Sequence, residues 1–198
     1  MRDIYSPFLI GSRFRICPPG TTDRTDERIN LLMDRGAFGS GEHETTVSCL
    51  EWLESFPFSG RGTILDLGSG TGILTIAALL LGGGQAWCVD IEPDAVDSCR
   101  RNCAHNDLEE RVSHCCGTLE SLNEEGFELV LANIYGDILL EIAETLVAKT
   151  LPGGRLLLSG ILWEYNFDVR KRYQQLGCRL IKNRLLDEFS TVLLEKLT

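Results

Sequence analysis

A run of glycines beside an acidic residue is the part of this sequence best suited to chemistry. Gly68, Gly70 and Gly72 follow a short apolar segment that contains Asp66. Glycines let the backbone turn tightly and approach a ligand without interference from a Cβ atom. The spacing differs from the dinucleotide pattern G-x-G-x-x-G, because Ile73 stands where the third glycine would be. The loop therefore predicts a ligand site that is not a typical dinucleotide site.

Two carboxylates narrow the choice of ligand. Asp66, just before the glycines, would repel a pyrophosphate but suits a ligand that carries an ammonium and a sulfonium. S-adenosylmethionine has both groups and no phosphate. Asp90 ends the next apolar segment, where its carboxylate could accept hydrogen bonds from both ribose hydroxyls, although it could also be a solvated acid at a strand end. The pair predicts S-adenosylmethionine as cofactor.

Asn133 is the candidate catalytic residue. It follows the apolar run 127–132, which is typical of a strand inside a sheet. Beside the cofactor, its amide oxygen could orient an incoming amine. The alternative is an Asx-turn residue that only caps the strand.

The elements that must position these residues alternate between strand and helix from about residue 63 onward. We expect strands at 63–66, 86–90, 112–116, 127–132 and 155–159, helices at 73–81, 94–106, 137–150 and 166–176, and a closing antiparallel hairpin at 179–186 and 189–195. Such alternation predicts a doubly wound, mostly parallel α/β sheet. Ligands bind such sheets beyond the carboxyl ends of the strands, where the candidate residues fall.

Composition indicates the class of protein and its setting. The chain has 198 residues, of which 43% are hydrophobic and 24% charged, as expected for one globular domain. The apolar stretch 73–81 is too short to cross a bilayer, and the first residues lack a secretory signal, so we expect a cytoplasmic protein without a membrane partner. A net charge of −10 argues against direct nucleic-acid binding and is compatible with a basic protein partner, although acidity also serves solubility.

Eight cysteines occur without any C-x-x-C pair. We expect reduced thiols, several of them buried, and no metal. A zinc site is the alternative, because Cys99 and Cys103 are followed by further histidines and cysteines. The spacing of those residues (His105, His114, Cys115 and Cys116) matches no zinc knuckle.

The segment 32–46 reads L-M-D-R-G-A-F-G-S-G-E-H-E-T-T and resembles the A-F-G-T-G-x-H-x-T-T signature of the PrmA family. These bacterial enzymes methylate the eleventh protein of the large ribosomal subunit. The segments 66–72, 89–93, 132–134 and 158–162 are similar to the same family, and the resemblance covers about residues 6–198. It implies a seven-stranded Rossmann-like methyltransferase sheet and N-methylation of lysine or other amino groups on a protein, possible partners being a basic ribosomal protein or a small-molecule acceptor.

The resemblance also implies roles by position. Thr46 and the Phe38-Gly39 turn would close over the cofactor, and Asn133 would contact its amino-acid end or the target amine. The remaining implied contacts are Gly68, Ser69 and Gly70 to the methionyl part, Asp90 with Ile91 to the ribose, and Thr118 and Leu119 to the adenine. His43 and Glu44 receive no role, and His43 could equally be a helix-start residue with its ring in solvent.

The sequence departs from the family pattern in two places. Asp34-Arg35-Gly36 is one residue shorter than the family's Asp-Pro-Gly-Leu. The family also has a separate N-terminal substrate-binding domain, whereas we expect residues 1–35 to be an appendage, as a hairpin or extended, and 36–198 to be the S-adenosylmethionine-dependent methyltransferase domain alone.

Three other functions remain open. The chain could methylate another protein or a small molecule, or it could be a non-catalytic partner that binds the cofactor. A nicotinamide oxidoreductase on a similar fold is disfavoured by the glycine spacing and by the absence of a Tyr-x-x-x-Lys pair.

Overall fold

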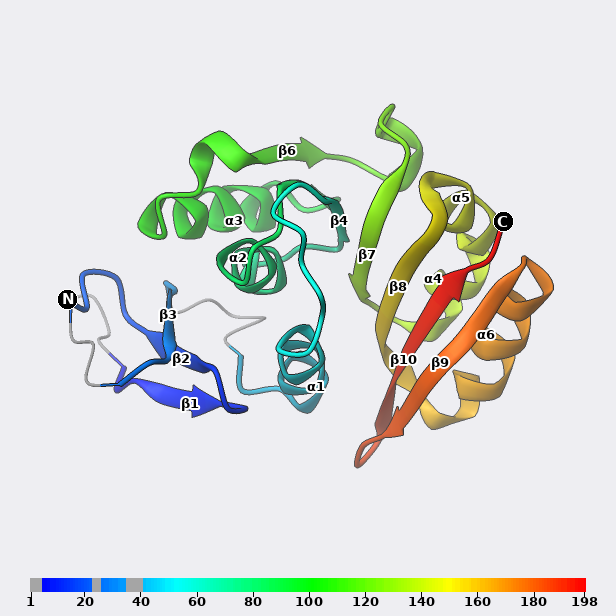
Figure 1. Ribbon diagram of the computed structural model, residues 1–198, viewed down its shortest axis with the longest axis horizontal. Coiled ribbons are helices and arrows are strands. Elements are labelled where there is room, and N and C mark those ends of the chain that lie inside the picture. Colours follow the sequence, from blue (N-terminus) through cyan, green and yellow to red (C-terminus); the bar gives the residue numbers. More distant parts are fainter. Residues whose placement is uncertain (1–4, 23–25, 35–40) are drawn as a thin grey trace.

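Seven strands form one twisted sheet in the computed structural model, which describes residues 5–22, 26–34 and 41–198. The strand order is β6-β5-β4-β7-β8-β10-β9 (Figure 1). Neighbours from β6 to β8 run parallel, and β10 runs antiparallel to both β8 and β9. The predicted doubly wound sheet with a C-terminal antiparallel hairpin is therefore confirmed.

The elements agree with the sequence-based expectation at most positions. Their bounds are β1 Phe8–Ile10, β2 Phe14–Cys17, β3 Ile29–Leu32, α1 Glu44–Leu53, β4 Thr63–Leu67, α2 Ile73–Leu80, β5 Gln85–Asp90, α3 Pro93–His105, β6 Val112–Cys116, β7 Phe127–Asn133, α4 Gly136–Glu141, α5 Ala143–Lys149, β8 Thr150–Leu162, α6 Trp163–Gln175, β9 Cys178–Leu185 and β10 Phe189–Lys196. Short 3-10 turns, Glu109–Arg111 and Leu119–Ser121, flank β6.

Helices cover both faces of the sheet and bury two separate apolar clusters. One cluster lies under α1, α2 and α3, and the other under α4, α5 and α6. Side chains of β4 alternate between them, with Ile64 in the first and Leu65 and Leu67 in the second. Because the side-chain period of a strand is two, Asp66 points to the α1–α3 face.

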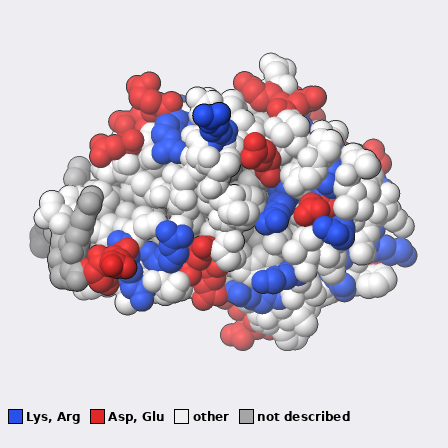
Figure 2. All heavy atoms as spheres, in the orientation of Figure 1, with Lys and Arg blue, Asp and Glu red and all other residues white. Residues whose placement is uncertain are grey.

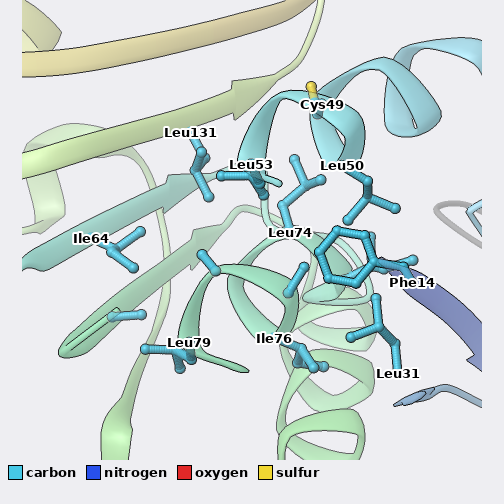
Figure 3. Close-up of a cluster of buried hydrophobic side chains, with 14 of the residues drawn as sticks. Phe14, Leu31, Cys49, Leu50, Leu53, Ile64, Leu74, Ile76, Leu79 and Leu131 are labelled. Atoms are coloured by element: carbon cyan, nitrogen blue, oxygen red, sulfur yellow. The ribbon is translucent and has the colours of Figure 1, made fainter. Parts of the chain in front are cut away.

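The N-terminal strands pack onto the first cluster. β1 and β2 form a hairpin, one of the two forms considered for this segment, and β3 adds to β2 in parallel. Figure 3 shows Phe14 of β2 and Leu31 of β3 beside Ile76 of α2, and all three side chains are fully buried. The proposed domain boundary between residues 35 and 36 lies outside the described residues and stays a prediction.

Two details of the predicted elements were wrong. The single helix expected at 137–150 is two helices, because the backbone at Ile142 departs from helical geometry (φ −89°, ψ 4°). The segment 151–154, expected to follow that helix as a loop, lies within β8. The pairing register jumps from Phe127↔Thr150 to Leu129↔Arg155, so the proline and glycines there form a bulge in the strand.

Membrane insertion has no support from the helices. Within the part of the chain that the structure describes, none of them is long and apolar enough to cross a bilayer.

Candidate functional site

The glycine loop joins β4 to α2 at the carboxyl edge of the sheet and is attached to the neighbouring strand. The backbone amides of Gly68 and Ser69 donate hydrogen bonds to the Val89 carbonyl, at 2.8 and 3.2 Å. Gly68 has a φ of 68°, and a Cβ there would lie 2.4 Å from Cγ2 of Ile134. A side chain is therefore excluded at Gly68 both by backbone conformation and by space.

Asp90 lies at the end of β5 and holds the same loop. Its Oδ2 accepts a hydrogen bond from the Gly70 amide (2.8 Å), and its Oδ1 accepts one from the Glu92 amide (3.1 Å). A carboxylate offers about four acceptor positions, so these two bonds leave capacity for the hydroxyls of a ribose. The structure thus places Asp90 beside the loop, as the sequence predicts.

Asp66 is buried on the α2 side of β4, with 2% of its surface exposed. Burial raises the pKa of its carboxyl to about 6, although the Thr75 hydroxyl donates a hydrogen bond at 2.7 Å that opposes the rise. The charge on Asp90 raises this pKa further. Two acids therefore share the loop region, and a cationic ligand would relieve the unfavourable burial of the Asp66 charge. Nothing in the sequence pattern singled out Thr75.

Asn133 and Thr46 meet, although 87 residues separate them in the sequence. The amide nitrogen of Asn133, at the end of β7, donates to the hydroxyl of Thr46 in α1 at 3.4 Å. Thr46 is buried, with 3% exposed, and Asn133 is half-buried. Two residues predicted for the site are thus brought together. Because this bond uses the nitrogen of the Asn133 amide, the oxygen of the same group is the atom that can accept a hydrogen bond from a ligand.

The first turn of α1 is fixed by the residues of the signature that received no role. His43 is the N-cap, which was the alternative weighed for it, and its exposed ring lies edge-on to the ring of Phe189, with 5.3 Å between the ring centroids. The carboxylate of Glu44 accepts hydrogen bonds from the backbone amides of Asp187, Glu188 and Phe189 at 2.9, 3.2 and 3.3 Å. Glu44 therefore attaches the β9–β10 turn to α1, a function that sequence reasoning missed.

The predicted contacts for ribose and adenine lie at the ends of β5 and β6. Ile91 is 64% exposed, Thr118 is exposed, and Leu119 is buried in the second cluster. The Gly117 amide donates to the Asp90 carbonyl at 2.9 Å, which brings this segment to the edge of β5. Their contacts with a cofactor stay a prediction.

One buried polar atom in the glycine loop has no protein partner among the described residues. The hydroxyl of Ser69 is buried without a hydrogen bond. Buried polar groups are almost always paired, so this hydroxyl fits a ligand that supplies a polar atom. A contact between Ser69 and S-adenosylmethionine stays a prediction. Phe38 and Gly39, the predicted cover of the cofactor, lie outside the described residues.

Two asparagines, Asn102 in α3 and Asn106 at the C-cap of that helix, support the site and were not predicted. Asn102 is fully buried; its amide nitrogen donates to the Thr71 carbonyl (2.9 Å) and its oxygen accepts from the Asp34 amide (2.8 Å). Asn106 binds the backbone of Leu32 through both its oxygen (3.0 Å) and its nitrogen (2.8 Å). They connect the glycine loop to the segment before the signature. Their four-residue spacing on a helix was the one available signal.

Charges of both signs are spread over the face shown in Figure 2. Basic side chains gather toward the β9–β10 side, and acidic ones lie mostly elsewhere on this face. The negative net charge is therefore not uniform over the molecule.

Solved structures that share the fold define its class. One, described as a ribosomal protein L11 methylase from Lactobacillus delbrueckii subsp. bulgaricus, has a TM-score of 0.87 at 21% identity and covers 99% of this chain and 100% of that one. An RNA methyltransferase from Salinibacter ruber in complex with S-adenosyl-L-homocysteine has a TM-score of 0.59 at 17% identity, covering 76% of this chain and 88% of that one. The fold is the Rossmann-like fold of methyltransferases.

Sequence comparison identifies the family. Residues 1–196 match the family model described as Ribosomal protein L11 methyltransferase (PrmA), and the chain belongs to that family. Relatives named "Ribosomal protein L11 methyltransferase" include those of Hahella chejuensis (40% identical over 171 residues, 86% of this chain) and Trichlorobacter lovleyi (43% over 176 residues, 85% of this chain). The matched region spans 58% and 57% of the length of these relatives.

Proposed function

We propose that this chain is the catalytic domain of an S-adenosylmethionine-dependent methyltransferase that methylates amino groups of a ribosomal protein. The observation that carries the proposal is the contact between Asn133 and Thr46. It joins the signature helix to the end of the strand next to the glycine loop, so a cofactor and an acceptor amine would meet there. Family membership supports the same activity.

In this proposal the residues of the loop region bind the cofactor, which supplies a methyl group on a positively charged sulfur. Gly68, Ser69 and Gly70 line the loop, Asp90 receives the ribose, and Asp66 provides the negative charge beneath them. The two acids favour a cationic ligand without phosphate over a nucleotide.

Asn133 positions the acceptor. Its nitrogen is held by Thr46, so its amide oxygen accepts a hydrogen bond from the incoming amine and fixes the lone pair for in-line attack. A lysine amine has a pKa of about 10.4 in water, so the amine must lose a proton before it attacks. We assign that proton to water, since none of the residues placed here acts as a base on the acceptor.

The substrate class follows from the family and from charge. The relatives are named for ribosomal protein L11, and a basic ribosomal protein complements a net charge of −10. A cytoplasmic location and the absence of direct nucleic-acid contact belong to the same proposal.

The test is methyl transfer from labelled S-adenosylmethionine to a panel that contains ribosomal protein L11, other basic proteins and small amines. We expect labelling of L11 amino groups by the wild-type chain and at least a hundredfold slower transfer by Asn133→Ala. Asn123→Ala, at an exposed asparagine, is the matched control and should retain full activity.

The outcome separates the alternative functions. If only another acceptor is labelled, the proposed substrate is wrong but the proposed methyl transfer stands. Cofactor binding without transfer to any acceptor would refute the proposed activity, and equal rates for Asn133→Ala and the wild type would refute the catalytic role assigned to Asn133.

A further inference from the structure

Two thiols and an imidazole meet below the glycine loop, on three different elements. Sγ of Cys88 in β5, Sγ of Cys99 in α3 and a ring nitrogen of His114 in β6 all lie within 4.8 Å of one another. Cys88 and Cys99 are buried, with 1% and 0% exposed, and His114 is half-buried. We call these three side chains the thiol–imidazole cluster. The proposed transfer mechanism uses none of them.

The cluster has the chemistry of a metal site. We infer that Cys88, Cys99 and His114 bind one zinc ion, which links β5, α3 and β6 beneath the cofactor loop. Thiolate sulfur and imidazole nitrogen are the preferred zinc ligands in proteins. Zn–S and Zn–N bonds of about 2.3 and 2.0 Å place ligand atoms roughly 3.5–4 Å apart, so closing the cluster around an ion requires only small side-chain movements.

A buried polar atom without a partner supports the same inference. Nδ1 of His114 is buried and has no hydrogen-bond partner among the residues that the structure describes. Such an atom is costly unless something binds it, and a metal ion would. Cys103 lies one helical turn beyond Cys99 in α3 and is buried, which makes it the candidate for a fourth ligand.

The site differs from the zinc site weighed in the sequence. His105, one of the residues considered there, instead contacts the Asp34 carboxylate at 3.3 Å. Cys88, which no local spacing connected with the others, takes part because β5 pairs with β6 in parallel and places Cys88 opposite His114. Ligands drawn from three elements form no compact motif, so sequence spacing could not reveal the site.

The ion would stabilise the glycine loop, because the cluster lies directly against it. A Cβ at Gly72, the last residue of the glycine loop, would lie 2.5 Å from Sγ of Cys99. An ion that fixes Cys99 would therefore also fix the wall against which the loop packs. Binding Zn²⁺ at two thiols and a neutral imidazole releases two protons, one from each thiol, and involves no redox change.

Cobalt and zinc binding to the reduced full chain test this inference. Titration with Co²⁺ should give thiolate-to-cobalt charge-transfer bands at one equivalent, and Zn²⁺ should displace them, whereas Mg²⁺ should not. Cys99→Ala and His114→Gln should each lower the affinity for Co²⁺ at least a hundredfold. Cys178→Ala removes a buried cysteine outside the cluster and should leave binding unchanged.

Circular dichroism checks that the variants are folded. If Cys99→Ala is unfolded, the test uses His114→Gln, which is the milder substitution. Zinc should raise the melting temperature of the wild type and of Cys178→Ala but not of His114→Gln. Absence of charge-transfer bands in the wild type, or an unchanged affinity of His114→Gln for Co²⁺, would overturn the inference. These measurements need no methyl transfer, so they stand apart from the proposed activity.

Discussion

Binding of S-adenosylhomocysteine should weaken about tenfold when the pH falls from 7 to 5. Burial raises the pKa of Asp66 to about 6 in the free protein, so about nine-tenths of this carboxyl is ionised at pH 7 and about one-tenth at pH 5. The ammonium of the ligand keeps its charge throughout and favours the ionised acid. The loss of affinity corresponds to about 1.4 kcal/mol.

Isothermal titration calorimetry from pH 5 to 8 measures the effect, with circular dichroism to verify the fold at each pH. Asp66→Asn should bind more weakly at pH 7 and give a nearly flat profile, which removes contributions from other titrating groups. An affinity for the wild type that stays constant between pH 5 and 7, in protein that remains folded, would refute the placement of Asp66 beneath the cofactor.

The raised pKa of Asp66 also predicts how the stability of the free protein depends on pH. Its pKa in the folded state lies above the ordinary value of 3.8, so its stabilising contribution is complete below about pH 4 and is lost as the pH rises through 6. A rise of about two units corresponds to roughly 3 kcal/mol. Without ligand, Asp66→Asn should therefore unfold at higher urea concentration than the wild type at pH 8, and this advantage should vanish near pH 4.

Three substitutions test the packing that supports the site, each by urea denaturation. Gly72→Ala should lower the free energy of unfolding by about 2 kcal/mol or more, because the new Cβ would lie 2.5 Å from Sγ of Cys99. The control is Gly153→Ala, where φ is similar (76° against 78° at Gly72) but the space around the Cβ is open, so the loss should be clearly smaller. Tyr173→Phe should cost about 1–2 kcal/mol, because the buried hydroxyl donates to a backbone carbonyl of α4 at 3.0 Å. Lys149→Met should cost about 2–3 kcal/mol, because its buried ammonium donates to two backbone carbonyls at 2.6 and 3.1 Å; stabilities equal to the wild type would contradict these assignments.

The sheet was predictable because its strands and helices carry periodic apolar patterns. Asp90 and Asn133 could be placed at its carboxyl edge for the same reason, as each is the last residue of an apolar strand. The bulge in β8 could not be foreseen, because a proline and two glycines are ordinary turn residues and only the pairing with β7 makes them part of a strand. The local apolar pattern thus predicts the helices and strands, whereas an irregularity such as this bulge depends on pairing with a neighbouring strand.

The contacts within the site were harder to predict than its location. Thr46 was predicted through family resemblance and Asn133 from its place at the end of an apolar strand, and only the structure shows that they touch. Thr75 carries no sequence signal for the site it supports, and Asn102 only its four-residue spacing from Asn106, since a threonine or an asparagine on a helix is common. Long-range polar contacts depend on the packing of whole elements, which residue spacing does not encode.

Glu44 has a consequence for biosynthesis. Its carboxylate is bound by amides that follow it by 143 to 145 residues. A ribosome therefore exposes the start of α1 long before it makes the turn that anchors it. The attachment of α1 to this turn can therefore be completed only after translation has passed Phe189, when the final hairpin folds back onto the helix.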